Sequence, residues 1–420
     1  MIMNILIFLV GLAVYAGYGW AGFAYLACAI LLSYGAGLLT KKAKWVMWVA
    51  VGLNAAMLTL LKLQGPLGIS LIAPLGVSYF TLQIISYNVD VYKGKYEPEK
   101  NLFRFALFVT YLPHLFIGPI DRYDTVGKAL FEDRQMSWEN FLAGAARAIW
   151  GLFKKLVIAS RVGVIISAIS ADPEAFRGAY ALAAMLLYSV QLYADFSGGM
   201  DAVLGLSRML GIRLSENFDV PYLSQSFQEF WRRWHMTLGS WLRNYVYIPL
   251  GGNRKGKVRK VINLIITFLV SGFWHGVQYI LWGLFNGIFV AFGTKLQTKW
   301  KTLNRIGTVL LISLLWSFFV WPDALTAMKM VGSVFTTFNY GEFLTTVGTL
   351  GLTVGDWIVL AVSVASLWIY DVNKQKLGAW FEKISPAAKT ALICGISLLV
   401  LVFGMYGIGF NAESFIYSKF

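Results

Sequence analysis

The chain has 420 residues, of which 58% are hydrophobic and only 14% charged, and its formal net charge is +15 at pH 7. This balance excludes an ordinary soluble protein and indicates a single integral membrane domain over residues 1–420, with no soluble domain. The basic residues fall in short gaps between apolar runs, which is the pattern of cytoplasmic loops rather than of a nucleic-acid-binding face. We therefore expect membrane lipid around the chain and no nucleic acid as a partner.

Eleven apolar runs are candidates for transmembrane or re-entrant helices. A helix needs about 20 residues to cross the roughly 30 Å hydrocarbon layer, and the alternation typical of a membrane β-barrel is absent from the sequence. Because helices are the other way to satisfy the backbone in lipid, we predict an all-α polytopic membrane protein of roughly eleven helices. In chain order the runs are 4–18, 21–39, 46–63, 71–91, 103–120, 142–167, 178–210, 261–293, 305–321, 355–371 and 388–408.

Cysteine and histidine are too sparse and too scattered to predict a metal site. Cys28 and Cys394 lie in separate apolar runs, as small core residues do, and the three histidines are His114, His235 and His275. Neither residue type has the spacing of a metal centre, so we expect no bound metal.

The segment 212–260 differs from the apolar runs because it is too polar to span a membrane yet rich in aromatic residues interleaved with arginine. That composition is typical of the membrane–water interface and predicts an interfacial or cytoplasmic segment. Apolar residues recur at three- and four-residue steps over 227–242, which predicts one helix with one apolar face. Arg232, Arg233 and Arg243 lie off or beside that face, and a turn at 249–253 follows.

His275 is an ionisable residue within the next apolar run. A polar group at membrane depth is costly and indicates function, although a core histidine bonded to a neighbouring helix is the alternative. The 15 residues from Lys260 correspond to roughly 22 Å of helix, which places His275 past the middle of the membrane. A straight helix over 261–290 would be roughly 45 Å long, so it either tilts strongly or breaks near Gly272 and Gly276. A break favours a cavity at His275, since irregular backbone at that depth must line a cavity or be buried in protein.

The chemistry open to His275 is that of a general base. An unperturbed imidazole has a pKa of about 6.5, and the neutral ring can take the proton of a hydroxyl that attacks an acyl group. The sequence has no Gly-x-Ser-x-Gly elbow to suggest a serine acyl-enzyme.

A set of motifs around the two later histidines occurs in one order along the chain. They are Asp195-Phe-Ser-Gly198, Gly205-Leu-Ser-Arg-Met-Leu-Gly211, Glu216-Asn-Phe218, Pro221-Tyr-Leu-Ser224, Glu229-Phe-Trp-Arg-Arg-Trp-His-Met236, Tyr245-Val-Tyr-Ile-Pro-Leu-Gly-Gly-Asn253 and Gly272-Phe-Trp-His-Gly276. In this order and spacing the chain resembles the membrane-bound O-acyltransferase (MBOAT) family, in particular the bacterial branch typified by the membrane subunit of alginate O-acetylation.

The resemblance implies a fold of many helices around a central tunnel or funnel in the bacterial cytoplasmic membrane. It assigns catalysis to His275 of the Trp-His-Gly motif and places His235 of the Arg-Trp-His motif on the cytoplasmic side of the route. It implies no bound cofactor, with acyl-CoA (acetyl-CoA above all) or an acyl-carrier thioester as co-substrate. The acceptor would be a hydroxyl of an extracellular polysaccharide, or an extracytoplasmic SGNH-type acyltransferase that acts as a partner.

Other candidate residues surround the two histidines. We expect Arg232, Arg233 and Arg243 to meet phosphates of the donor, with ordinary cytoplasmic-loop charge as the alternative for each. Trp234 and Trp274 are expected to shape the tunnel. Asp195 and Asn217 are candidates for the site or for helix capping and polar networks, and Asn244 stands beside Arg243.

The sequence departs from the branch at four places, which leaves the acceptor polysaccharide open. Asn244 replaces the usual Asp, Gly199-Met200 replaces a Tyr-Ser pair, Asn286 stands where His is common, and His114 stands where Gln is usual. Two alternatives to O-acetylation remain at this point. One is D-alanyl transfer to teichoic acid from a carrier-protein thioester, and the other is a transporter or flippase in which the histidines relay protons.

Overall fold

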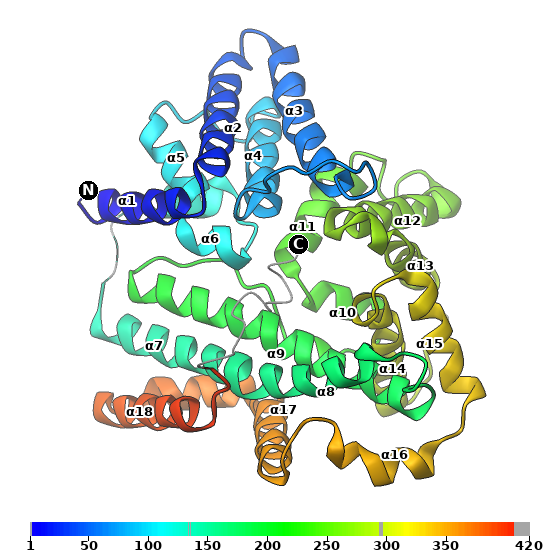
Figure 1. The fold of residues 1–420 in the computed structure, drawn as a ribbon. Helices are drawn as coiled ribbons and strands as arrows, with labels where there is room; N and C mark the ends of the chain where they lie inside the picture. The colour runs from blue at the N-terminus through cyan, green and yellow to red at the C-terminus, as the bar shows by residue number, and fades with distance from the viewer. Residues whose placement is uncertain (1, 133, 135, 294–296, 407–420) are drawn as a thin grey trace.

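The computed structural model describes residues 2–132, 134, 136–293 and 297–406. Within this part of the chain the secondary structure is helical and contains no β-strand, apart from one isolated bridge between Phe218 and Trp234. The predicted all-α fold is confirmed. Figure 1 shows an N-terminal group of helices in blue and cyan above a later group, with α10 to α13 between and beside them.

The N-terminal group comprises six helices. Helices α2, α3 and α4 pack against one another. Their buried side chains, with those of α1, α5 and α6, form one hydrophobic cluster, called here the N-terminal core. Tyr87 is central to it, and its ring lies 4.6 Å from that of Phe105 and 5.2 Å from that of Tyr123. The helices are α1 (Ile2–Gly17), α2 (Trp20–Leu39), α3 (Lys44–Leu63), α4 (Val77–Tyr92), α5 (Leu102–Thr110) and α6 (Leu112–Ile117).

The later group forms a second hydrophobic cluster, the C-terminal core. Its centre is the close pair α7 and α9, where a Cβ atom on Gly151 would lie 2.4 Å from the carbonyl oxygen of Gly198. Small residues of this kind let membrane helices approach closely. The elements are α7 (Trp138–Phe153), the π-helical η2 (Lys154–Ala159), α8 (Ser160–Ala171), α9 (Ala179–Met209), α14 (Lys301–Val320), α15 (Ala324–Thr336), α16 (Tyr340–Thr346), α17 (Val354–Lys383) and α18 (Pro386–Phe403).

The central elements connect the two cores. Trp234 and Trp282 belong to the C-terminal core, whereas Leu238 and Trp274 belong to the N-terminal core. Along the sequence, each of His235 and His275 is flanked by a residue of the N-terminal core on one side and a residue of the C-terminal core on the other. Both histidines therefore lie where the two cores meet. The elements are α10 (Phe227–Arg233), α11 (Met236–Leu242), the π-helical η4 (Arg243–Tyr247), α12 (Gly256–His275), the 3₁₀ turn η5 (Val277–Tyr279) and α13 (Ile280–Phe292).

The predicted number of spans is not confirmed. Five of the described helices, α2, α3, α14, α17 and α18, are long and apolar enough to cross a membrane by length and composition. Several apolar runs are not single helices: 103–120 divides into α5 and α6, and 261–293 divides into α12 and α13. The last two residues of the run 388–408 lie outside the described residues.

The placement of the cysteines as core residues is wrong. Cys28 on α2 and Cys394 on α18 are exposed free thiols. Both helices are candidate spans, and an apolar run in a membrane chain does not distinguish a face that is buried in protein from one that faces lipid.

Candidate functional site

A cavity of about 380 Å³ lies where the two cores meet. Its volume is within the range of small-molecule sites, and its wall is mainly apolar and aromatic. The two histidines are buried, whereas three cations of the wall are exposed, so the cavity runs from a basic mouth to a buried inner end. Its wall includes Gln228, Trp231, Arg232, Trp234, His235, Arg243, Tyr247, Lys260, Thr267, Ser271, His275, Trp282, Trp316 and Phe319.

His275 is the last residue of α12, and the chain turns directly after it. Gly276 has φ 150° and ψ 153°, and the turn η5 then leads into α13, which runs back along α12. The two helices approach through glycine: a Cβ atom on Gly283 would lie 2.3 Å from the carbonyl oxygen of Phe268, and one on Gly272 would lie 3.2 Å from the Cα of Gly283. Of the two alternatives for this run, a strong tilt or a break near Gly272 and Gly276, the structure shows the break, and the single span over 261–293 is replaced by a helical hairpin.

Aromatic rings surround the His275 imidazole. The ring centroids of Trp274, Trp282 and Phe319 lie 4.8, 5.5 and 5.9 Å away, all at steep angles. His275 is 6% exposed and lines the cavity. The imidazole therefore has access to the cavity while most of its surroundings are apolar.

His235 occupies a break between two short helices, so the predicted single helix over 227–242 is wrong. α10 ends at Arg233, His235 takes the left-handed conformation with φ 47° and ψ 52°, and α11 begins at Met236. Residues 217–219 of the same chain replace the helical hydrogen bonds that are lost at the break. The Met236 amide donates to the Asn217 carbonyl (3.0 Å), and the Asp219 amide donates to the Arg233 carbonyl (3.0 Å).

The His235 side chain is held by a neutral amide. Its Nδ1 lies 3.2 Å from Oδ1 of Asn217, and its ring packs against Phe196 at 4.9 Å and Trp274 at 6.1 Å. His235 lies outside the five candidate spans, and burial lowers its pKa to about 3. The ring is therefore uncharged at neutral pH.

One face of α12 lines the cavity along its length, which the sequence interpretation missed. Lys260, Thr267, Ser271 and His275 all contribute to the wall. They are separated by seven, four and four residues, so they lie on one side of the helix. This spacing was readable from the sequence, because it places Thr267 and Ser271 on the same side of a helix as His275.

The structure brings five of the predicted site residues to the cavity. They are His275, His235, Trp234, Arg232 and Arg243. Arg232, Arg243 and Lys260 are exposed and form its basic mouth.

The other five predicted residues do not line this cavity. Trp274 donates from Nε1 to the Ser78 carbonyl (3.3 Å), and Arg233 pairs with Glu229 (2.7 Å). Asn244 donates to the Ser240 hydroxyl (3.4 Å), and Asp195 pairs with Lys155. Asn217 supports His235 from behind and lines a separate cavity of about 430 Å³ beside α7, α9 and α17.

The aromatic wall contains residues that no motif indicated. Trp282 and Trp316 stack with centroids 5.9 Å apart and planes 19° apart, and Phe319 lies 5.2 Å from Trp282. Trp282 follows His275 by seven residues and was within the run already singled out. Trp316 and Phe319 come from α14, a distant apolar run with no local signal that it returns to this cavity.

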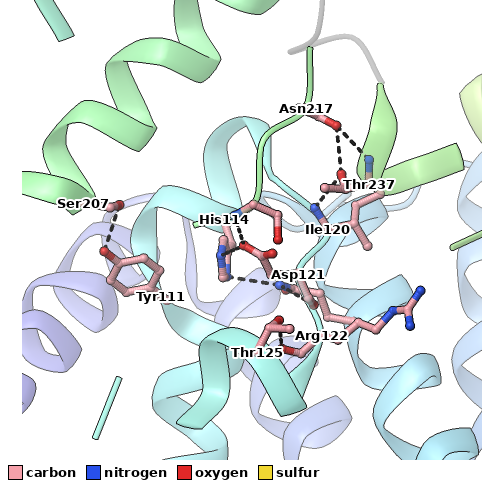
Figure 2. A network of polar contacts seen from close by, with 11 residues as sticks. Tyr111, His114, Ile120, Asp121, Arg122, Thr125, Ser207, Asn217 and Thr237 are labelled. Carbon is pink, nitrogen blue, oxygen red and sulfur yellow. Dashed lines mark hydrogen bonds and ion pairs between the residues drawn. The ribbon is translucent and has the colours of Figure 1, made fainter. Parts of the chain in front are cut away.

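The third histidine, His114, belongs to a buried polar network outside the cavity wall. Its Nε2 lies 3.2 Å from Oδ2 of Asp121 and its Nδ1 lies 3.1 Å from Nε2 of Gln83. Figure 2 shows His114 and Asp121 beside the hydrogen bonds that connect Ile120 to Thr237 and Thr237 to Asn217. The Ile120 amide donates to the Thr237 hydroxyl (3.1 Å), so this network is linked to the support of His235.

Comparison with known proteins identifies the family of the chain. The sequence model of MBOAT, the membrane-bound O-acyltransferase family, matches residues 98–337, which is more than half of the chain. The chain belongs to the membrane-bound O-acyltransferase family. It is therefore an acyltransferase and a membrane protein, and a transporter without a covalent step is no longer needed to explain its histidines.

Three curated members of the family illustrate its range. The chain is 35% identical over 401 residues to a probable alginate O-acetylase AlgI of Pseudomonas fluorescens, covering 91% of this chain and 80% of that one. It is 34% identical over 298 residues to a peptidoglycan O-acetyltransferase of Helicobacter pylori, covering 62% and 56%. It is 32% identical over 283 residues to a teichoic acid D-alanyltransferase of Streptococcus thermophilus, covering 62% and 67%.

Proposed function

We propose that this acyltransferase moves an acetyl group from a cytoplasmic thioester across the bacterial cytoplasmic membrane to a hydroxyl of an extracellular polysaccharide, directly or through an SGNH-type partner. One observation carries the proposal: a single cavity has a basic mouth and two buried histidines at its inner end. A phosphorylated thioester fits that polarity, with its phosphates at the mouth and its acyl group inside.

The donor is expected to bind through its phosphates. Arg232, Arg243 and Lys260 are exposed residues of the wall and present three cations to a ligand that enters. Guanidinium groups bind phosphate through paired hydrogen bonds, and lysine binds it as a point charge. Trp231 and Trp282 supply apolar surface further in, against which the thioester arm can pack.

His275 is assigned the role of general base. The acceptor oxygen attacks the thioester carbonyl while the imidazole takes the hydroxyl proton, which gives a tetrahedral intermediate. The C–S bond then breaks, the new ester forms, and the imidazolium returns its proton to the departing thiolate. The aromatic surroundings exclude water, which limits hydrolysis of the thioester.

D-alanyl transfer from a carrier-protein thioester remains as a second candidate. It is favoured by the identity to the Streptococcus thermophilus relative, which covers two thirds of that protein. Both donors carry a phosphopantetheine thioester, so the same basic mouth fits either. The donor must be distinguished by experiment.

The test uses the full chain in lipid nanodiscs and in its host bacterium. Nanodiscs receive labelled acetyl-CoA or a labelled D-alanyl carrier protein with the host envelope polysaccharide, and label on the polysaccharide is measured. In cells, ester content of the surface polysaccharide is measured after deletion and complementation. We expect acetyl transfer by the wild type and a loss of about 100-fold or more in His275→Ala, the range for removal of a general base.

His114→Gln is the matched control, because it replaces a buried histidine outside the cavity wall. Its transfer rate per folded molecule is expected to stay within about twofold of wild type, since glutamine can copy both hydrogen bonds of the ring. Wild-type transfer by His275→Ala would contradict the role of His275. Transfer of D-alanine alone, or of neither group, would contradict the proposed donor or the proposed function.

A further inference from the structure

We propose that Asn217 is a positioning residue that fixes His235 as the tautomer protonated on Nδ1, so that Nε2 is the nitrogen through which this cavity residue takes part in acyl transfer. The proposal rests on the proposed function for its catalytic consequence. The tautomer itself follows from the hydrogen bonds around the Asn217 amide.

The first step is the orientation of the Asn217 amide, which the Thr237 backbone decides. The Thr237 N–H lies 3.0 Å from the atom assigned as Oδ1 of Asn217. A backbone N–H can only donate, so the atom that faces it must be an acceptor. Rotating the amide by 180° would place two donors against each other, and the oxygen therefore points toward Thr237 and His235.

The Thr237 hydroxyl supports the same orientation. The Ile120 amide donates to Oγ1 of Thr237 (3.1 Å), which leaves the hydroxyl proton for Oδ1 of Asn217 (2.9 Å). Figure 2 shows Asn217, Thr237 and Ile120 in this chain of contacts. Thr237 thus donates twice to the same oxygen, once from the backbone and once from the side chain.

The second step is the proton on His235. Its Nδ1 lies 3.2 Å from Oδ1 of Asn217, and that oxygen has no proton to give. The contact is attractive only when Nδ1 carries the proton and donates. Burial keeps the ring neutral, and a neutral imidazole has one protonated nitrogen, so Nε2 carries the lone pair.

The third step is the rigidity of this arrangement. Asn217 holds the helix break from both sides: its side chain bonds to His235 and Thr237, and its carbonyl accepts from the Met236 amide (3.0 Å). Asn217 is 1% exposed and His235 3%, so these bonds are largely shielded from bulk solvent. Two of the rings packed against His235 are Phe196 and Trp274, which do not titrate, and His275 is a titratable residue of the same cavity wall.

A direct test is available because the chain has only three histidines. ¹⁵N-histidine labelling of the full chain in lipid bilayers gives three pairs of ring nitrogen signals by solid-state NMR, assigned with His114→Gln and His275→Ala. We expect the His235 signals of a neutral ring protonated on Nδ1, with Nε2 unprotonated. A His235 ring protonated on Nε2 would overturn the proposal, whatever the enzyme transfers.

Two variants test the role of the amide. Asn217→Leu removes the acceptor, so His235 should populate the Nε2–H form and the transfer rate should fall by about tenfold. Asn217→Asp keeps the acceptor and adds a negative charge, which favours the imidazolium. Its transfer rate should be restored toward wild type, with the acidic limb of the pH–rate profile moved to higher pH.

Thr237→Val is the matched control. It removes the hydroxyl bond to Asn217 but keeps the backbone donor and the His235 contact. It should lower thermal stability without altering the His235 tautomer or the pH–rate profile. If Asn217→Asp shows the wild-type pH profile, Asn217 is a structural clamp and the proposal is wrong. An unchanged NMR tautomer together with no acyl transfer in wild type would reject the proposed function and leave the tautomer assignment standing.

Discussion

His114 and His235 are both buried, yet their partners and the space around them differ. His114 is fully enclosed, with Nε2 near the Asp121 carboxylate (3.2 Å) and Nδ1 near the Gln83 amide nitrogen (3.1 Å). That amide nitrogen also donates to the Asp121 carbonyl (3.4 Å), so it faces His114 as a donor. In this arrangement Nδ1 of His114 accepts and Nε2 donates, which is the opposite of His235.

Burial is common to both histidines, so burial alone does not distinguish a histidine within the fold from one that lines a cavity. Both ring nitrogens of His114 are used by fixed neighbours, and the residue joins α6 to the chain around Asp121. His235 uses Nδ1 for Asn217 and lines a cavity that also contains His275. The first site therefore joins parts of the fold, and we predict that the second meets a ligand.

The largest effect on the contrast between His114 and His235 is expected when the carboxylate partner of His114 is removed. Asp121→Ala removes the carboxylate that accepts from His114 and from the Ser215 amide (3.4 Å). Losing a buried hydrogen bond to a charged group costs about 1.5–3 kcal/mol, so thermal unfolding in detergent should shift clearly downward. His114→Gln, which keeps a donor toward Asp121, should shift it much less.

The comparison predicts that this damage is structural. The transfer rate per folded Asp121→Ala molecule should fall far less than in His275→Ala. A complete loss of transfer in well-folded Asp121→Ala would place the network in the reaction and remove the contrast between the two histidines.

The sequence predicted the helical class and left one break as an alternative, and it missed another for a physical reason. A break near Gly272 and Gly276 was one of two alternatives, because a run of 30 residues is too long for one straight span that is not strongly tilted, and the structure ends α12 just before Gly276. The break at His235 was missed because the apolar steps continue from α10 into α11 and are insensitive to one residue in the left-handed conformation. The bonds that permit that conformation come from Asn217, 18 residues earlier.

The candidate site was predictable where it is local in sequence. His275, His235, Trp234 and Arg232 lie in two motifs, Arg243 lies just before a third, and the structure places all five on one cavity. Trp316 and Phe319 lie on α14, and their contribution depends on how distant helices pack. Helix packing between apolar runs leaves no local pattern, because a buried face and a lipid-facing face have similar composition.

A second prediction concerns how the stability of the folded protein depends on pH through His235. Burial lowers the pKa of folded His235 from 6.5 to about 3. Between these values the unfolded chain binds a proton that the folded chain does not, so stability falls as pH drops from about 6.5 toward about 3. The contribution of one such group is at most about 1.4 kcal/mol per pH unit.

The measurement is thermal unfolding in detergent across pH 4–7 for wild type and His235→Gln. His235→Gln should flatten the dependence of the unfolding temperature on pH, because the group that takes up a proton on unfolding is removed. Parallel curves for wild type and His235→Gln would contradict this prediction.

The smallest expected effect is a difference in KM between variants of two adjacent arginines, which the sequence analysis did not distinguish. Arg232 is exposed and lines the cavity, whereas Arg233 pairs with Glu229 one helical turn earlier (2.7 Å) and does not line it. Arg233→Ala should cost about 0.3–0.5 kcal/mol of stability and leave the KM for the thioester donor within about twofold. Arg232→Ala should raise that KM by about tenfold, since a charged hydrogen bond to phosphate is lost.

Salt provides the control for this pair. Exposed charge interactions are screened when the ionic strength rises from about 0.1 M to about 1 M, so the KM difference between wild type and Arg232→Ala should narrow. If Arg232→Ala and Arg233→Ala raise KM equally at low salt, the two arginines attract the donor through long-range electrostatics and Arg232 does not bind its phosphates directly. Because one side chain lines the cavity and its neighbour does not, an unequal response would locate the donor phosphates at the Arg232 side of α10.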